Sequence, residues 1–145
     1  MKQLLSETNT QLEGEAFEVI FNDKDVKKVN QAKGVDNVQR SAVNFYGPKV
    51  TNADVEQFYS QKKSPNPEKP LSFGLNSKLV KENGELKELV YKSGGLYGEA
   101  IDEIIKWLEK AQGVAENKQQ AEALALLIEY YKTGDLQIWD DYNVA

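Results

Sequence analysis

The sequence predicts an α+β fold that is mostly helical, with a small β-hairpin and a C-terminal αα-hairpin followed by a third helix. Three observations predict it: an Asn-Gly turn between two strand-like runs, apolar residues at helical spacing from residue 96 onward, and glycines where helices should end. The chain has 145 residues, of which 40% are hydrophobic, enough for one domain with a core. We therefore expect a single domain over 1–145.

The first fifty residues carry weak signals. Residues 1–14 are polar and show no sustained periodicity, so we expect a loosely ordered arm. A short apolar cluster at 16–21 precedes a polar turn at 22–25. Apolar residues around 43–46 predict a short extended segment that ends at Gly47-Pro48.

A first helix is predicted over 52–62. Thr51 has the side chain of an N-cap, and Asp54 supplies an acidic residue in the first turn. Apolar residues then recur at i, i+3 and i+4 from Val55. Three of the four prolines follow within 65–70, which predicts an extended, exposed connection.

A β-hairpin is predicted from runs at 71–81 and 85–92. Asn83-Gly84 lies between them, and this pair favours the type I′ turn, which needs positive φ at both central residues. In the second run, Glu88 interrupts the alternation of apolar residues.

The C-terminal third predicts three helices. The first covers about 96–112 and ends at Gly113, the second begins at the cap Asn117 and ends at Gly134, and Asp135 caps the third. Aromatic residues recur there at helical spacing, and we expect them to pack in the core: Trp107, Tyr130, Tyr131, Trp139 and Tyr142.

The composition excludes several chemistries. The chain has no Cys and no His, so it holds no disulfide, thiolate nucleophile, histidine acid/base or His-ligated zinc. A net charge of −5 with a single arginine, Arg40, disfavours nucleic acid and anionic membrane surfaces as partners. We therefore expect no nucleic-acid partner, no membrane partner and no cofactor in this chain.

Two motif-like features have ordinary structural interpretations. The stretch 93–98 contains three glycines between a strand and a helix, as a dinucleotide phosphate loop does, but a second helix follows where a parallel strand is required. We interpret it as a hairpin-to-helix joint. The carboxylates Glu99, Asp102 and Glu103 allow a carboxylate hydrolase as a hypothesis, but Lys106 at helical spacing favours a solvated helix face.

Longer strings carry a resemblance to a known family. They are Phe73 to Gly84, Gly94 to Tyr97, Trp107 to Ala111, Val114 to Asn117, Leu127 to Gly134 and Trp139 to Tyr142, with Lys28 to Ala32 and Asn44 to Gly47 upstream. Over about 17–145 the chain resembles bacterial dipeptidyl peptidase III proteins.

The resemblance implies a zinc-dependent enzyme that releases dipeptides from peptide N-termini. Family members are several times longer and have two lobes around a wide cleft, with zinc held by an H-E-x-x-x-H motif and a later glutamate. This chain has no His, so that motif is absent. The resemblance therefore implies a non-catalytic fragment of the lobe that does not hold zinc, with no catalytic and no metal-binding residue of its own. Zinc belongs to the intact enzyme, and the expected partners are the rest of the parent polypeptide and the peptide substrate.

Three residues are candidates for lining the substrate cleft. Asn44, Tyr46 and Asn76 are polar or amphipathic and lie near Gly47 and Gly74, where backbone can approach a peptide. Loop packing and turn hydrogen bonds are the alternative interpretation.

A free-standing helical protein-interaction module remains the second functional hypothesis. For a fragment we also expect self-association through exposed apolar surface of the third helix, at Ile138, Trp139, Tyr142 and Val144. The chain has no N-glycosylation sequon, which fits a cytoplasmic location.

Overall fold

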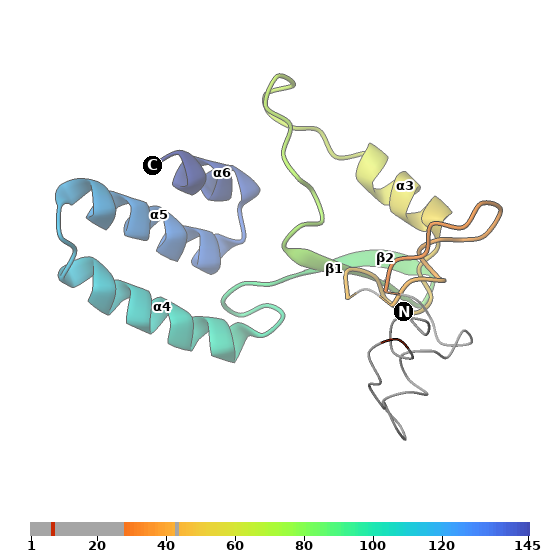
Figure 1. The fold of residues 1–145 in the computed structure, drawn as a ribbon, viewed down its shortest axis with the longest axis horizontal. Helices are drawn as coiled ribbons and strands as arrows, with labels where there is room; N and C mark the ends of the chain where they lie inside the picture. The colour runs from red at the N-terminus through yellow and green to blue at the C-terminus, as the bar shows by residue number, and fades with distance from the viewer. Residues whose placement is uncertain (1–6, 8–27, 43) are drawn as a thin grey trace.

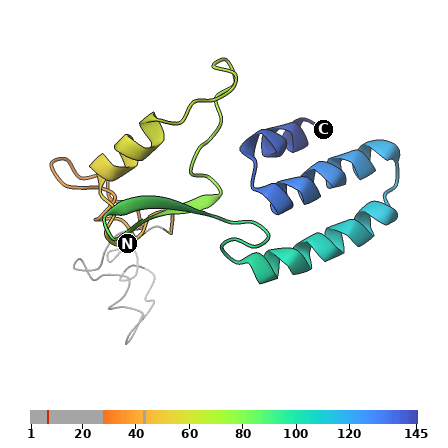
Figure 2. The ribbon, with the colours of Figure 1, turned by 180° about the vertical axis from the view of Figure 1, so that it is seen from behind.

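The computed structural model describes Glu7, residues 28–42 and residues 44–145 (Figure 1). The predicted loose arm at 1–14, apart from Glu7, and the apolar cluster at 16–21 lie outside the described residues. In the described part, a β-hairpin and one helix lie on one side and three helices on the other (Figures 1 and 2). The α+β, mostly helical class is confirmed.

The β-hairpin consists of β1 (Ser77–Glu82) and β2 (Glu85–Val90), paired antiparallel from Ser77↔Val90 to Glu82↔Glu85. The turn residues have φ of +51° at Asn83 and +87° at Gly84, which confirms the type I′ prediction. The first strand begins at residue 77 rather than 71, because Gly74 has a φ of +83° and Leu75 N–H bonds back to Ser72 in a turn.

A short segment pairs with the free edge of β1. The backbone of Leu79 donates to Phe45 O and accepts from Gly47 N–H, at 2.8 and 2.7 Å, and Tyr46 pairs with Leu79 in a parallel bridge. This agrees with the extended segment predicted before Gly47-Pro48. Covering the edge removes an exposed row of backbone donors and acceptors, and the side chain of Leu79 is fully buried.

Helix α3 (Asn52–Ser60) packs on the hairpin. Thr51 and Asp54 form a full capping box, as the sequence predicts: Thr51 Oγ1 accepts from the backbone of Asp54, and the Asp54 carboxylate accepts from that of Thr51. The helix ends two residues before the predicted end. Asp54 also pairs with Lys81 of β1 at 2.8 Å, which ties the start of α3 to the hairpin.

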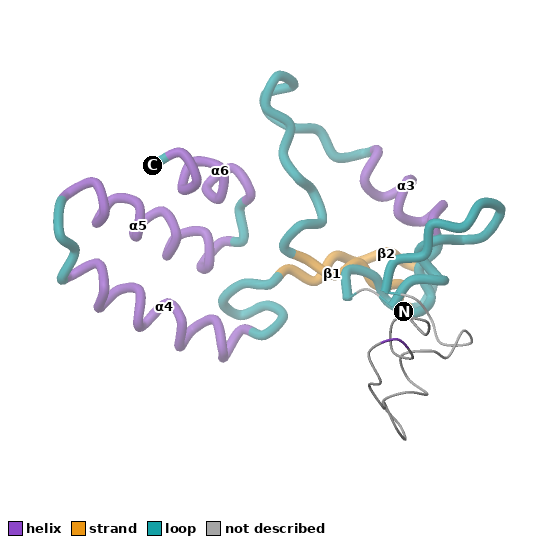
Figure 3. Tube along the Cα trace, viewed as in Figure 1, coloured by secondary structure: helices purple, strands orange, loops and turns teal. Residues whose placement is uncertain are grey.

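The C-terminal helices are α4 (Gly98–Gly113), α5 (Lys118–Thr133) and α6 (Leu136–Val144). Three predicted caps are confirmed: Asn117 accepts from Gln120, Asp135 accepts from Gln137, and Gly134 ends α5 with a φ of +72°. The prediction that Gly113 caps α4 is wrong, because Gly113 is still helical, without positive φ, and Val114 is the cap. Helix α5 lies between α4 and α6 (Figures 1 and 3). None of the helices in the described ranges is long and apolar enough to cross a membrane.

The helical core is small. Ile101 and Ile105 of α4 pack against Ile128 of α5, with Tyr91, Leu108 and Tyr131 partly buried around them. The predicted aromatic packing is confirmed for the contact between Tyr130 and Trp139, whose ring centroids lie 4.9 Å apart.

Two predictions about exposure are wrong. Trp107 is exposed, because α4 packs against α5 on one side only and Trp107 lies on a different face from Ile101 and Ile105. Of the four α6 residues expected to be exposed, Val144 is exposed, whereas Ile138, Trp139 and Tyr142 are half-buried. The reason is that α6 folds back along α5, where Trp139 contacts both Tyr130 and Tyr142.

Candidate functional site

A polar cluster lies where α3, β1 and β2 meet. At its centre is Glu88 of β2, whose carboxylate accepts hydrogen bonds from Ser77 Oγ at 2.6 Å and Tyr59 OH at 3.1 Å. The ammonium group of Lys62, just beyond the end of α3, pairs with the other carboxylate oxygen. Ser77 and Glu88 lie diagonally opposite on one face of the hairpin, so the strand register itself brings them together.

Lys62 lies among three aromatic rings. Its Nζ is 5.2 Å from the centroid of Phe58, 5.6 Å from that of Tyr59 and 5.5 Å from that of Phe73. Cation–π attraction and the carboxylate of Glu88 thus hold the ammonium group from several sides. Gly74 makes room for this arrangement, since a Cβ there would lie 2.8 Å from Tyr59 OH.

The charges of the cluster are fixed at neutral pH. Burial raises the pKa of Glu88, but the hydrogen bonds and charge of Lys62 together with Ser77 outweigh it, so the net pKa is lowered. Burial and the neighbouring Glu88 charge raise the pKa of Tyr59 to about 12. The carboxylate is therefore ionised and the phenol protonated near pH 7, and neither is tuned for proton transfer. The cluster acts as a structural tie.

A pocket of about 240 Å³ lies beside the cluster. Lys62, Phe73 and Asn76 line it from the hairpin side, and Gly134 and Leu136 line it from the corner between α5 and α6. It is therefore formed by both halves of the described fold.

Asn76, predicted as cleft-lining, borders this pocket but is buried. Its Nδ2 donates to Gly134 O at 2.8 Å, and its backbone carbonyl accepts from Tyr91 N–H at 2.8 Å. The side-chain amide is therefore engaged in joining the hairpin to the end of α5.

The other two candidates lie elsewhere. Tyr46 is half-buried beside β1 and lines a separate pocket of about 310 Å³ together with Val38, Gly47 and Pro48. Asn44 is exposed. The structure thus does not bring Asn44, Tyr46 and Asn76 together in one pocket, and their role at a substrate cleft stays a prediction.

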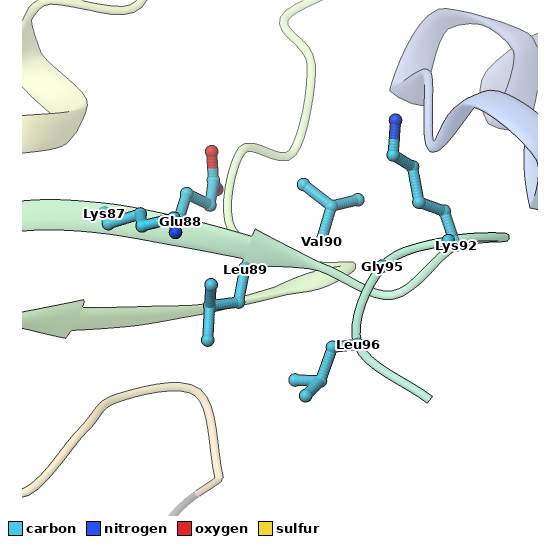
Figure 4. Close-up of a pocket in the computed structure, with 8 residues that line it drawn as sticks. Lys87, Glu88, Leu89, Val90, Lys92, Gly95 and Leu96 are labelled. Atoms are coloured by element: carbon cyan, nitrogen blue, oxygen red, sulfur yellow. The ribbon is translucent and has the colours of Figure 1, made fainter. Parts of the chain in front are cut away.

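The glycine-rich joint at 93–98 borders a depression of about 470 Å³ after β2 (Figure 4). Leu89 and Leu96 point to one side of the backbone, and Val90 and Lys92 point to the other side. The backbone amides of the joint are used internally: Gly95 N–H donates to Lys92 O at 2.9 Å and Leu96 N–H to Val90 O at 2.9 Å. Because these amides are already hydrogen-bonded, they are not free donors for a phosphate, which agrees with the interpretation as a hairpin-to-helix joint.

The acidic residues of α4 form a solvated face, as expected. Glu103 pairs with Lys106 at 3.4 Å across an exposed turn, and Asp102 accepts from Ser93 Oγ. Within the described ranges, acidic side chains do not gather in groups of three or more that could hold a metal ion.

Sequence reasoning did not find the pair of Lys62 and Glu88. One signal was visible, because Glu88 occupies an apolar position in the alternating pattern of β2. Its partner, 26 positions away, had no such signal.

A scan against models of known protein families matches none of them to this chain, and a search of curated proteins finds no relative. The resemblance to dipeptidyl peptidase III proteins is therefore carried by the sequence strings alone.

Proposed function

We propose that this chain is a non-catalytic segment of the substrate lobe of a zinc-dependent dipeptidyl peptidase, an enzyme that releases dipeptides from peptide N-termini. The segment supports the wall of the cleft and the hinge on which the two lobes close. The proposal starts from the strings that resemble dipeptidyl peptidase III proteins, and above all from the unbroken run from Phe73 to Gly84.

The scaffolding role is supported by the positions of the family-like sequence stretches in the fold. They supply the joints between elements: Gly74 fits against Tyr59, and Asn76 bonds to Gly134 across 58 positions of sequence. Gly134 in turn lies against β2, where a Cβ would come within 2.6 Å of Val90 Cγ1. Family-like residues therefore occupy positions where side-chain size and hydrogen bonding set the arrangement of the elements.

The sparse interior also supports a segment that packs against further chain. Only six hydrophobic side chains are buried in the described residues: Val50, Leu79, Ile101, Ile105, Ile128 and Tyr130. Large hydrophobic side chains such as Trp107 and Val114 are exposed instead. Further polypeptide covering this surface accounts for both features.

Zinc does not fit the residues of this chain. Catalytic zinc takes about three protein ligands, which usually include His. The chain has no His and no Cys. Within the described residues its carboxylates do not gather in a group that could hold a metal ion. In the proposed enzyme, the metal and the water that it activates belong to another part of the polypeptide.

The reading frame of the gene tests the proposal. We expect the frame to continue past the codon for Ala145 and to encode an H-E-x-x-x-H sequence downstream. A natural stop codon directly after Ala145, with no such sequence upstream either, contradicts the proposal.

A free-standing helical interaction module is the second candidate function. One observation favours it: α4 exposes Ile104 and Trp107, and its N-cap residue Tyr97 is exposed beside them. Large apolar and aromatic side chains of this kind are typical of protein-binding surfaces. A complete gene of about this length supports the module.

A further inference from the structure

Helix α4 carries a second apolar face that no other helix of the described chain covers, although the ring of Tyr97 at one end stacks on Tyr91. Its residues follow a regular spacing of 3, 4, 3, 4 and 3 along the helix and its ends, and we name them the α4 stripe: Tyr97, Ala100, Ile104, Trp107, Ala111 and Val114. The four large side chains are 70%, 43%, 64% and 83% exposed at positions 97, 104, 107 and 114.

The α4 stripe is separate from the face that holds α4 in the fold. Ile101 and Ile105, which pack against Ile128 of α5, lie beside the stripe and are buried. Helix α5 occupies that side only, and α4 forms the outer edge of the three-helix group (Figures 1 and 2). A 3-4 spacing is the pattern by which one helix packs along another. The stripe therefore has the form of a helix-pairing seam.

The charges along the outer flank of the stripe are divided between its two halves. Glu99 and Glu103 lie in the N-terminal half, and Lys106 and Lys110 lie in the C-terminal half. All four residues are exposed, and Lys110 Nζ lies 4.1 Å from the centroid of the Trp107 ring, at the edge of the stripe. A helix with this charge pattern is complementary to its own reversed copy.

We propose that the α4 stripe pairs with the α4 stripe of a second copy of this chain, in antiparallel orientation. About the two-fold axis, Ile104 faces Trp107 of the other copy and Ala100 faces its Ala111. Glu103 then lies near Lys110 of the other copy, and symmetry repeats this charge pair. A parallel pairing places Glu103 beside an apolar residue of the other copy rather than beside a lysine.

The small area of contact makes the proposed dimer weak. Two helices of about four turns each bury less surface than the ~1,200 Å² at which stable interfaces begin. We expect a monomer–dimer equilibrium with a Kd on the order of 10–100 μM, in the range of small transient contacts. This inference goes beyond the proposed function and concerns the purified chain on its own, because within a larger enzyme further polypeptide would cover the α4 stripe.

Sedimentation of the purified chain between about 5 and 500 μM tests the pairing. The wild type is expected to show a reversible dimer, and Ile104→Glu is expected to weaken it at least about tenfold, because a charge then faces an apolar ring. Glu103→Lys and Lys110→Glu should each weaken the dimer, and the double variant should restore it to within about threefold of wild type. Glu68→Lys and Lys69→Glu, in the exposed proline-rich loop, are the matched charge controls.

Orientation is tested by cross-linking, for which the absence of native cysteine gives a clean background. Under oxidation, a mixture of the Ala100→Cys and Ala111→Cys chains should form a disulfide-linked heterodimer, whereas neither variant alone should cross-link efficiently. Efficient cross-linking of each variant with itself indicates a parallel pair and overturns the proposal. A strict monomer at 500 μM, or a dimer that Ile104→Glu leaves unchanged, overturns it as well and leaves other polypeptide as the occupant of the stripe.

Discussion

Glu88 shows how a single charged residue joins elements that are distant in sequence. Its carboxylate connects α3, through Tyr59 and Lys62, to Ser77 at the start of β1. Hydrogen bonds to a partly buried charge each contribute more than neutral ones, and removing the charge leaves their donors without an acceptor.

Glu88→Gln is expected to lower the free energy of unfolding by about 1–2 kcal/mol at pH 7, since a half-exposed charged cluster is partly screened. The folded-state pKa of Glu88 is lowered, so its contribution is present above the ordinary pKa of 4.5 and is lost as the pH falls below that value. Urea unfolding at pH 7 and pH 3.5 measures the effect.

The matched control for this prediction is Glu85→Gln, which changes an exposed glutamate of the same strand. It should shift the free energy of unfolding by less than about 0.5 kcal/mol. Equal effects of the two variants at pH 7, or a Glu88 effect that grows as the pH falls, contradict the assigned role.

Gly84 and Gly113 allow the effect of backbone strain on stability to be measured without a change in packing, because both have open space around them. Gly84 has a φ of +87° in the hairpin turn, whereas Gly113 lies in the last turn of α4 without positive φ, and an added Cβ meets nothing within 4 Å at either site. Gly84→Ala should destabilise the fold by about 1 kcal/mol, and Gly113→Ala should be neutral or stabilise it by up to about 0.5 kcal/mol. Thermal unfolding of both variants measures these changes. A similar loss of stability in both variants contradicts the assignment of the Gly84 effect to positive φ.

The local signals of the sequence were sufficient for the turn and the caps. Each of these features involves residues at most three positions apart in the sequence, so the local sequence alone determines its geometry. They are the Asn83-Gly84 turn, the capping box of Thr51 and Asp54, and the N-cap at Asn117. The contact of Asn76 with Gly134 and the pair of Lys62 and Glu88 join distant positions. Such contacts depend on how the elements pack, which no local spacing determines.

At the scale of elements, α4 shows that helical periodicity predicts where a helix forms more reliably than it predicts which faces of that helix are buried. The helix is apolar on two adjacent faces, and the helical spacing of its aromatic residues predicted that Trp107 packs in the core. Only the face with Ile101 and Ile105 meets another described element. Trp107 lies on the other face, so the core prediction failed there for lack of a second neighbour.

Substitutions on the two faces of α4 should therefore differ in their effect on the monomer. Ile105→Ala is expected to lower the free energy of unfolding by about 2–4 kcal/mol, because it leaves a cavity against α5. Trp107→Ala should change it by less than about 1 kcal/mol at protein concentrations below 5 μM, where pairing is negligible. Similar losses for both variants show that Trp107 is covered in solution and contradict the exposed face.

At the scale of the whole molecule, the described chain has two parts joined by few contacts. The hairpin with α3 and the group of α4, α5 and α6 meet at the joint 93–98 and at the contact of Asn76 with Gly134 (Figure 1). Such an arrangement gives a scaffold with much surface, and the sequence supplies neither a cysteine thiolate nor a histidine base.

The purified chain is therefore expected to be inert as a peptidase. Release of naphthylamine from a dipeptidyl-naphthylamide should match the rate in buffer, and zinc added at micromolar concentration should not bind in stoichiometric amount by calorimetry. Turnover by the chain alone that a chelator abolishes contradicts its assignment as catalytically silent.

The most direct measurement of the central claim is made on the native protein. Antibodies raised against residues 28–145 capture it from the source cells, and its mass and its chelator-sensitive release of dipeptides are then measured. We predict a polypeptide several times longer than 145 residues that releases dipeptides only while zinc is present. A captured protein of about 16.3 kDa without that activity contradicts the claim that this chain is part of a larger peptidase.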